Sequence, residues 1–128
     1  MFNPIDFYKF AKTLNECEKL ESEACDRTII GRCYYSSFLS SKQFAIELGS
    51  IELLEYDKPY FKRKGEIHSA VRDSLFEHHL GHIANFLKDL FDRRVDADYY
   101  PNKSINKKDA GEAIALCEMI SEKIKEFK

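Results

Sequence analysis

Arginine and tyrosine side chains are concentrated in residues 93–100, which read RRVDADYY. An arginine presents a planar fork of N–H donors to a phosphate group. A tyrosine can donate a hydrogen bond or stack on a nucleobase. Arg32 and Tyr35 supply the same two residue types in residues 27–48. These residues are candidates for binding RNA or a nucleotide, and we expect the two segments to face each other.

A structural role explains the same residues without any ligand. Arg93 or Arg94 can pair with an acidic residue, Asp96 or Asp98, at the end of a helix and so close the bundle. A tyrosine at helical spacing, such as Tyr35, more often belongs to a core than to a binding site. Spacing alone therefore favours the structural interpretation, and both interpretations stay open at this point.

Other motifs that carry chemistry are weak or missing. His78, His79 and His82 form an HHxxH pattern, whose first and last members share one side of a helix and could bind a metal ion. The HExxH order is missing, so we prefer a solvated turn and expect no metal or other cofactor. The 5 glycines are scattered, which excludes a P-loop, and no serine lies in a GxSxG motif.

The composition predicts one globular domain over residues 1–128. Hydrophobic residues make up 44% and charged residues 33% of the chain, as in ordinary globular domains. The net charge of −2 argues against a general nucleic-acid binder, so any RNA contact must be local. No apolar run approaches the roughly 18 residues that span a bilayer, and no signal-peptide pattern is present. We expect a cytoplasmic protein with reduced cysteines and no membrane contact, with Cys33 and Cys117 in its core.

The elements that must position the candidate residues are predicted to be helices. Apolar residues recur at helical spacing, and no segment alternates long enough to form a strand. Pro59 interrupts residues 50–65, which predict a packed loop with one helical turn. The fold class is therefore all-α, an antiparallel bundle of four long helices plus a shorter one. The predicted helices cover about residues 4–22, 25–48, 66–76, 83–97 and 107–126, with a break near residues 79–81.

Capping residues mark two of the predicted ends. Asn3 is the expected N-cap of the first helix, with Pro4 in the first helical position. Asn106 and Asp109 have the spacing of a capping box. Residues 27–48 carry a strong apolar pattern, and we expect the other helices to pack around this segment.

Three short motifs, taken in order, resemble the HEPN domain superfamily, and in particular its small stand-alone prokaryotic members. They are RCYYSSF at residues 32–38, the pair His68-Ser69 at the start of the third predicted helix, and RVDADY at residues 94–99. The resemblance covers about residues 25–125. Its specificity lies in the order and spacing of the motifs rather than in any one of them.

The resemblance implies a helical bundle that commonly dimerises, with the ends of its second and fourth helices near a shared cleft. Many HEPN proteins are metal-independent ribonucleases of toxin–antitoxin or anti-phage systems, often beside a nucleotidyltransferase. Their motif is an arginine followed, after roughly four to six residues, by a histidine. The arginine stabilises charge that develops on phosphorus, and the histidine moves protons. In this sequence Arg94 corresponds to the arginine, but Tyr99 stands in place of the histidine.

The resemblance also implies roles for individual residues. Arg94 would hold the phosphate, while Asp98 and Tyr99 would position it or the ribose. Because the reference pKa of tyrosine is about 10, Tyr99 is a poor base near neutral pH. His68 is therefore the candidate proton-transfer group of a metal-independent endoribonuclease, and whether the protein is an enzyme stays open. The further residues expected to bind RNA or a nucleotide are Arg32, Tyr35 and Arg93.

A second function is consistent with the same resemblance. In this alternative the domain is a non-catalytic homodimer whose surface binds a partner protein. A nucleotidyltransferase or a larger defence effector would be such a partner. The missing histidine motivates this alternative, because the catalysis that the resemblance implies depends on that residue.

Overall fold

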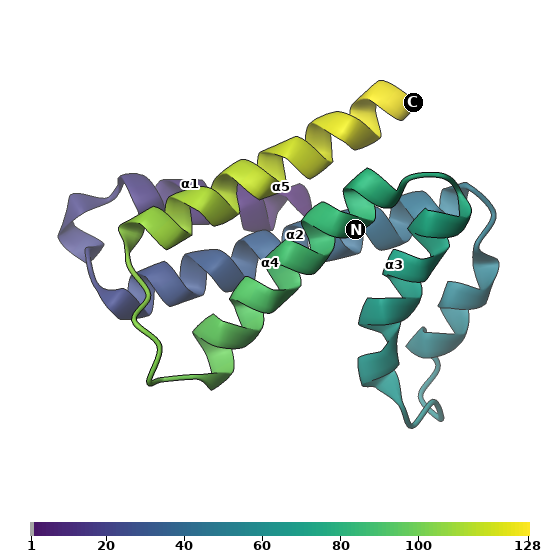
Figure 1. Cartoon of the computed structure of the whole chain (residues 1–128), viewed down its shortest axis with the longest axis horizontal. Coiled ribbons are helices and arrows are strands. Elements are labelled where there is room, and N and C mark those ends of the chain that lie inside the picture. Colours follow the sequence, from purple (N-terminus) through teal and green to yellow (C-terminus); the bar gives the residue numbers. More distant parts are fainter. Residues whose placement is uncertain (1) are drawn as a thin grey trace.

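The structure is a computed structural model that describes residues 2–128, except for the side chain of Leu20. Within this range the fold is all-helical and contains no strand, which confirms the all-α part of the predicted fold class. Short 3-10 helices connect the longer elements and cover Glu18–Leu20, Ile51–Asp57 and Lys64–Glu66. The five α-helices, drawn in Figure 1, are α1 (Ile5–Glu16), α2 (Glu23–Glu47), α3 (Ile67–Glu77), α4 (Gly81–Tyr99) and α5 (Lys107–Phe127).

Helix α2 is the central element of the fold. It packs against each of the other α-helices, as predicted for residues 27–48. Apolar residues at helical spacing form its buried surface, among them Ile30, Tyr34 and Phe38. Small hydroxyl side chains are also buried along this helix, and they let neighbouring helices approach closely. These serines are Ser36, Ser37 and Ser41.

The helices cross α2 in two directions. Helices α1 and α4 run opposite to α2, whereas α5 runs in the same direction (Figure 1). Helices α3 and α4 meet at residues 78–80 and spread apart from there (Figure 1). The start of α3 and the end of α4 therefore lie at the ends of the two helices that are far from this turn. Both helices pack on α2.

The first helix is shorter than predicted. It ends at Glu16 rather than near residue 22, because Cys17 adopts an extended conformation with φ −88° and ψ 98°. One 3-10 turn follows, and Ser22 then caps α2 by accepting a hydrogen bond from the N–H of Cys25 at 3.1 Å. The apolar pattern continues through this break, so periodicity alone could not locate it.

The other boundaries follow the prediction more closely. Residues 50–65 contain a seven-residue 3-10 helix, longer than the predicted turn, with Leu53 fully buried. The predicted break near residues 79–81 is confirmed, and His79 adopts a positive φ of 62° there. Helix α4 continues to Tyr99, so this residue is helical and does not lie in the turn beyond Ala97.

The predicted caps are confirmed at one end and modified at the other. Asn106 and Asp109 form a complete capping box at the start of α5. At the start of α1, Pro4 itself is the N-cap, and the Asn3 side chain accepts a hydrogen bond from the N–H of Ile5 at 3.2 Å. Asn3 therefore still satisfies a free backbone donor of the first turn.

The buried apolar side chains form one cluster beneath these helices. Cys33 and Cys117 belong to it, as predicted. Within residues 2–128, none of the helices combines the length and the apolar character needed to cross a bilayer.

Candidate functional site

Arg94 lies among tyrosine and aspartate side chains where α4 packs on α2. Its Nε atom forms an ion pair with Oδ2 of Asp98 at 2.8 Å, one turn further along α4. Its Nη2 donates hydrogen bonds to the hydroxyls of Tyr35 at 3.0 Å and Tyr99 at 3.4 Å. The guanidinium carbon lies 5.3 Å and 5.2 Å from the centres of those two rings, within cation–π range. The side chain of Arg94 is 13% exposed, so these contacts hold it in one orientation.

Tyr35 connects a second arginine to this group. The guanidinium carbon of Arg32 lies 5.4 Å from the centre of the Tyr35 ring. It also lies 4.8 Å from the ring of Phe7 on α1. The Tyr35 ring is therefore in cation–π range of guanidinium groups from two helices. Five predicted site residues thus come together, and we call them the Arg94 cluster: Arg32, Tyr35, Arg94, Asp98 and Tyr99.

His68 lies in the first turn of α3 and contacts Tyr34 of α2. Its Nδ1 is 2.5 Å from the hydroxyl of Tyr34. Its ring packs against Phe38 and Phe91, with centroid distances of 4.7 Å and 5.4 Å. These aromatic contacts fix the position of an imidazole that remains partly exposed.

Two adjacent tyrosines of α2 link His68 to the Arg94 cluster. Tyr34 contacts His68 of α3, and Tyr35 contacts Arg94 of α4. The two phenol rings meet edge to face, with centroids 5.5 Å apart. Nothing in the sequence pattern placed His68 beside Arg94, whereas the structure makes them neighbours of one tyrosine pair.

The electrostatic environment keeps His68 neutral near neutral pH. Its pKa lies below the ordinary value because burial disfavours the charged imidazolium and because Arg94 and Arg72 place positive charge nearby. Burial raises the pKa of Tyr34, so its hydroxyl keeps its proton. We assign this hydroxyl as the donor to Nδ1, since that choice gives the buried proton an acceptor. The Nε2 atom of His68 then carries the imidazole proton and can donate it in a hydrogen bond.

Arg94 contributes a permanent positive charge. Burial alone would lower its pKa, but Tyr35, Asp98 and Tyr99 raise the pKa overall. A guanidinium remains protonated at any physiological pH. A fixed cation beside a neutral N–H donor is a combination that can bind phosphate.

Arg93 lies outside this cluster. Its Nε is 2.8 Å from Oδ1 of Asp89, and its Nη1 is 2.8 Å from Oε2 of Glu112 on α5. The structure therefore places Arg93 where α4 packs on α5, although the sequence led us to group it with Arg94. Tyr99 does belong to the cluster, but it is 62% exposed in the last turn of α4.

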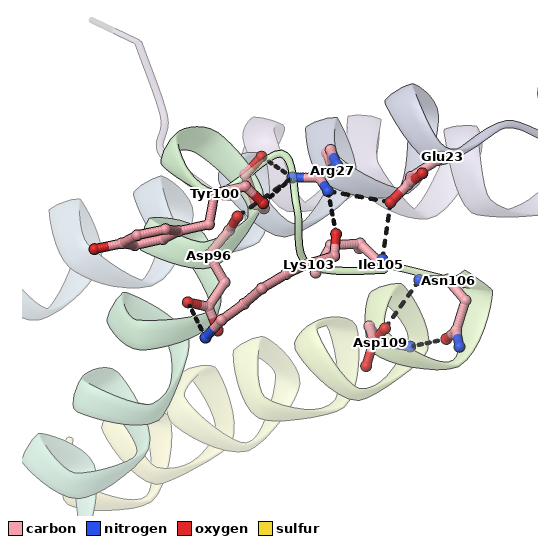
Figure 2. A network of polar contacts seen from close by, with 9 residues as sticks. Glu23, Arg27, Asp96, Tyr100, Lys103, Ile105, Asn106 and Asp109 are labelled. Atoms are coloured by element: carbon pink, nitrogen blue, oxygen red, sulfur yellow. Dashed lines mark hydrogen bonds and ion pairs between the residues drawn. The ribbon is translucent and has the colours of Figure 1, made fainter.

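Sequence reasoning missed the residue that holds the end of α4. Arg27 of α2 donates hydrogen bonds to the carbonyls of Ala97 at 2.9 Å and Lys103 at 2.5 Å. Glu23 accepts from Arg27 and from the N–H of Ile105, which ties the loop after α4 to α2 (Figure 2). This network fixes the last turn of α4, which carries Asp98 and Tyr99 of the Arg94 cluster. No spacing pattern distinguishes Arg27 from other charged residues on a helix.

The three histidines of the HHxxH pattern lie around the turn between α3 and α4. His79 and His82 are exposed, whereas the ring nitrogens of His78 lie 2.9 Å from the carbonyl oxygen of Ser74 and 3.2 Å from that of Leu48. His78 therefore joins the end of α3 to the end of α2. The predicted solvated turn is wrong for this residue. Within residues 2–128, no three His, Cys, Asp or Glu side chains are grouped as metal ligands would be.

Comparison with known proteins adds one partial similarity. A segment of 39 residues is 56% identical to the uncharacterized protein MJ0628 of Methanocaldococcus jannaschii. The match covers 30% of this chain and 24% of MJ0628, so this chain spans about a quarter of that relative. No family model matches the chain. No solved structure matches it either.

Proposed function

We propose that this chain is a HEPN-like antiparallel bundle that binds RNA or a nucleotide through a phosphate group held at Arg94. The observation that carries the proposal is the link from His68 through Tyr34 and Tyr35 to Arg94. It connects a neutral N–H donor on α3 with a permanent cation on α4 through two adjacent residues of α2. In this proposal the protein acts as a homodimer in a toxin–antitoxin or phage-defence setting.

Each residue has a distinct part in binding. Arg94 neutralises the phosphate, while Asp98 and Tyr35 keep its guanidinium in place. The exposed ring of Tyr99 is available to stack on a base. Arg32 adds positive charge on the α2 side of the cluster.

A metal-independent ribonuclease is the catalytic form of this proposal. The ribose 2′-oxygen attacks the adjacent phosphorus while its proton passes to a water molecule, and a 2′,3′-cyclic phosphate forms. The bond from phosphorus to the 5′-oxygen breaks, and that oxygen leaves with a proton from His68. Arg94 stabilises the charge on the phosphate oxygens. His68 transfers the proton to the leaving oxygen once its ring is protonated. Because the pKa of His68 is lowered, cleavage is expected to accelerate as the pH falls below neutrality.

The closed contacts of Arg94 favour a second candidate, a non-catalytic interaction module. Asp98 and two tyrosine hydroxyls already occupy its guanidinium, as they would in a purely structural network. In this candidate the exposed rings of Tyr99 and Tyr100 belong to a surface that contacts a partner protein. A nucleotidyltransferase or a defence effector remains the expected kind of partner.

Binding of a labelled single-stranded RNA, followed by fluorescence anisotropy with a chelator present, separates the two candidates. We expect Arg94→Gln to weaken RNA binding about tenfold or more, since a charge-assisted contact is lost. Arg63→Gln is the matched control, because it removes the same charge from a side chain that is 76% exposed. Equal affinity of wild type and Arg94→Gln, with both folded, would contradict phosphate binding and favour the interaction module.

A further inference from the structure

Arg72 is a positively charged residue that the contacts described so far leave unexplained. It lies on α3, one turn after His68, in a partly buried position. Its Nη1 atom is buried and has no hydrogen-bond partner in the part of the chain that the structure describes. No ion pair between residues 2 and 128 includes Arg72, whereas Arg93 and Arg94 are both paired with carboxylates. A buried guanidinium N–H without an acceptor is unfavourable, so such a group calls for a missing partner.

The position of Arg72 relates it to the site described above. Its guanidinium carbon lies 5.0 Å from the centre of the Phe91 ring on α4. The ring of His68 lies 5.4 Å from the same ring centre. Phe91 is therefore shared by the arginine and the histidine, and it holds the guanidinium by a cation–π contact.

Positive charge accumulates around this aromatic ring. Lys88 places its Nζ 5.3 Å from the centre of the Phe91 ring, although it is paired with Asp92 at 2.6 Å. Arg72 and Arg94 both act electrostatically on His68, and both act on Tyr34 as well. Two guanidinium groups therefore act electrostatically on the His68 imidazole and on the Tyr34 hydroxyl that it contacts. Positive charges that act on the same groups repel each other, and an anion bound among them would remove that repulsion.

We propose that Arg72 is a second phosphate-binding arginine, and that a phosphate group binds to Arg72, Arg94 and the Nε2–H of His68 together. The inference rests on the proposed function, because it concerns the ligand of that same site. It adds a residue from α3 that the HEPN resemblance does not supply. The phosphate gives the guanidinium of Arg72 an anionic partner, which no carboxylate between residues 2 and 128 provides. The shared chemistry is a phosphate group, carried by free phosphate, a mononucleotide or RNA.

Arg72 is expected to bind the phosphate without stabilising the folded chain. Replacing a buried donor that lacks an acceptor removes an unfavourable group from the folded state. Arg72→Gln is therefore expected to unfold at the same temperature as wild type or at a higher one. A residue that only held α3 on α4 would show the opposite behaviour, a lowered Tm with unchanged ligand binding.

The test is an NMR titration of the full chain with inorganic phosphate, followed at the His68 ring and the Arg72 Nε–H. In wild type both signals are expected to shift. In Arg72→Gln the phosphate affinity measured at His68 is expected to fall about tenfold or more, while the control Arg63→Gln behaves as wild type. Unchanged affinity in Arg72→Gln would overturn the proposal. If Arg72→Gln fails to fold, the titration of wild type is the test. The proposal is then overturned if phosphate shifts neither the His68 signal nor the Arg72 signal.

Parallel titrations with adenosine monophosphate and a short single-stranded RNA identify the source of the phosphate. They also separate this inference from the proposed function. RNA binding that is lost in Arg94→Gln and kept in Arg72→Gln would uphold the function and overturn the role of Arg72. Phosphate binding that depends on Arg72, without any RNA binding, would uphold the anion site and contradict the RNA proposal.

Discussion

Arg94 of α4 donates a hydrogen bond to the hydroxyl of Tyr35 on α2, at 3.0 Å and across 59 positions of the chain. The same guanidinium lies in cation–π range of the Tyr35 ring. This one pair therefore joins two helices by two kinds of contact. It places Arg94, the proposed phosphate-binding residue, against the central helix α2.

The energetic link between these two residues can be measured by a double-mutant cycle. Tyr35→Phe keeps the ring and removes the hydroxyl, so we expect it to lower the free energy of unfolding by about 1 kcal/mol. Combined with Arg94→Gln, the two losses should be non-additive by about 0.5–1.5 kcal/mol. Urea denaturation of the four proteins provides the values. Additive losses would show that the observed contact carries no coupling.

The pH dependence of stability reports on His68. Because its pKa is lowered in the folded state, the unfolded chain takes up a proton at higher pH than the folded chain does. The stability that neutral His68 contributes is therefore complete above the unfolded pKa of about 6.5, and it is lost as the pH falls through the lower folded pKa. We expect the Tm of wild type to decrease more over this range than that of His68→Gln, whose amide can still accept from Tyr34. Parallel Tm curves would contradict the lowered pKa.

Arg27 is expected to be a residue of stability rather than of binding. Its side chain is 18% exposed and donates to backbone carbonyls at the end of α4 and in the loop that follows. Arg27→Ala should lower the free energy of unfolding by about 2–3 kcal/mol, because charge-assisted hydrogen bonds are lost from a partly buried network. The exposed Arg63 serves as control, and Arg63→Ala should change stability by less than about 0.5 kcal/mol. Similar effects of both variants in chemical denaturation would argue against the anchoring role.

The cysteines should differ in their reactivity. Cys33 and Cys117 are buried where α2 packs on α5, and a hydrogen bond donated by the Cys33 thiol to Cys117, together with burial, raises the pKa of Cys33. Cys17 and Cys25 are partly exposed. A thiol reagent should therefore label this second pair in the native protein and all 4 cysteines after denaturation. Peptide mapping by mass spectrometry identifies the labelled residues, and rapid native labelling of Cys117 would contradict the packed core.

The fold was largely predictable because its helices are amphipathic and their ends carry recognisable caps. Asn106 with Asp109 located the start of α5 correctly. The end of α1 was not predictable, because apolar residues continue at helical spacing past Cys17. Helix α1 ends there because Cys17 adopts an extended conformation, and α2 begins only after the cap residue Ser22.

The candidate site was predictable in its residue types but not in its partners. Periodicity alone could place Arg32 and Tyr35 on one helix, and the expectation that this helix faces the segment of Arg94 came from the residue types. It could not show that Arg93 turns toward Glu112, because consecutive residues of a helix face different neighbours. The four-residue spacing of His68 and Arg72 was a visible signal of a shared face. Their approach to α4 depends on how α3 packs there, which no local pattern encodes.

The measurement that tests the central claim most directly is cleavage of a single-stranded RNA in the presence of a chelator. Wild type is compared with Arg94→Ala and His68→Ala, each confirmed to be folded. The account predicts metal-independent binding or cleavage that Arg94→Ala abolishes, with His68→Ala losing the cleavage step. If the folded wild type shows neither cleavage nor binding of the RNA, the proposed RNA-binding function at Arg94 is contradicted.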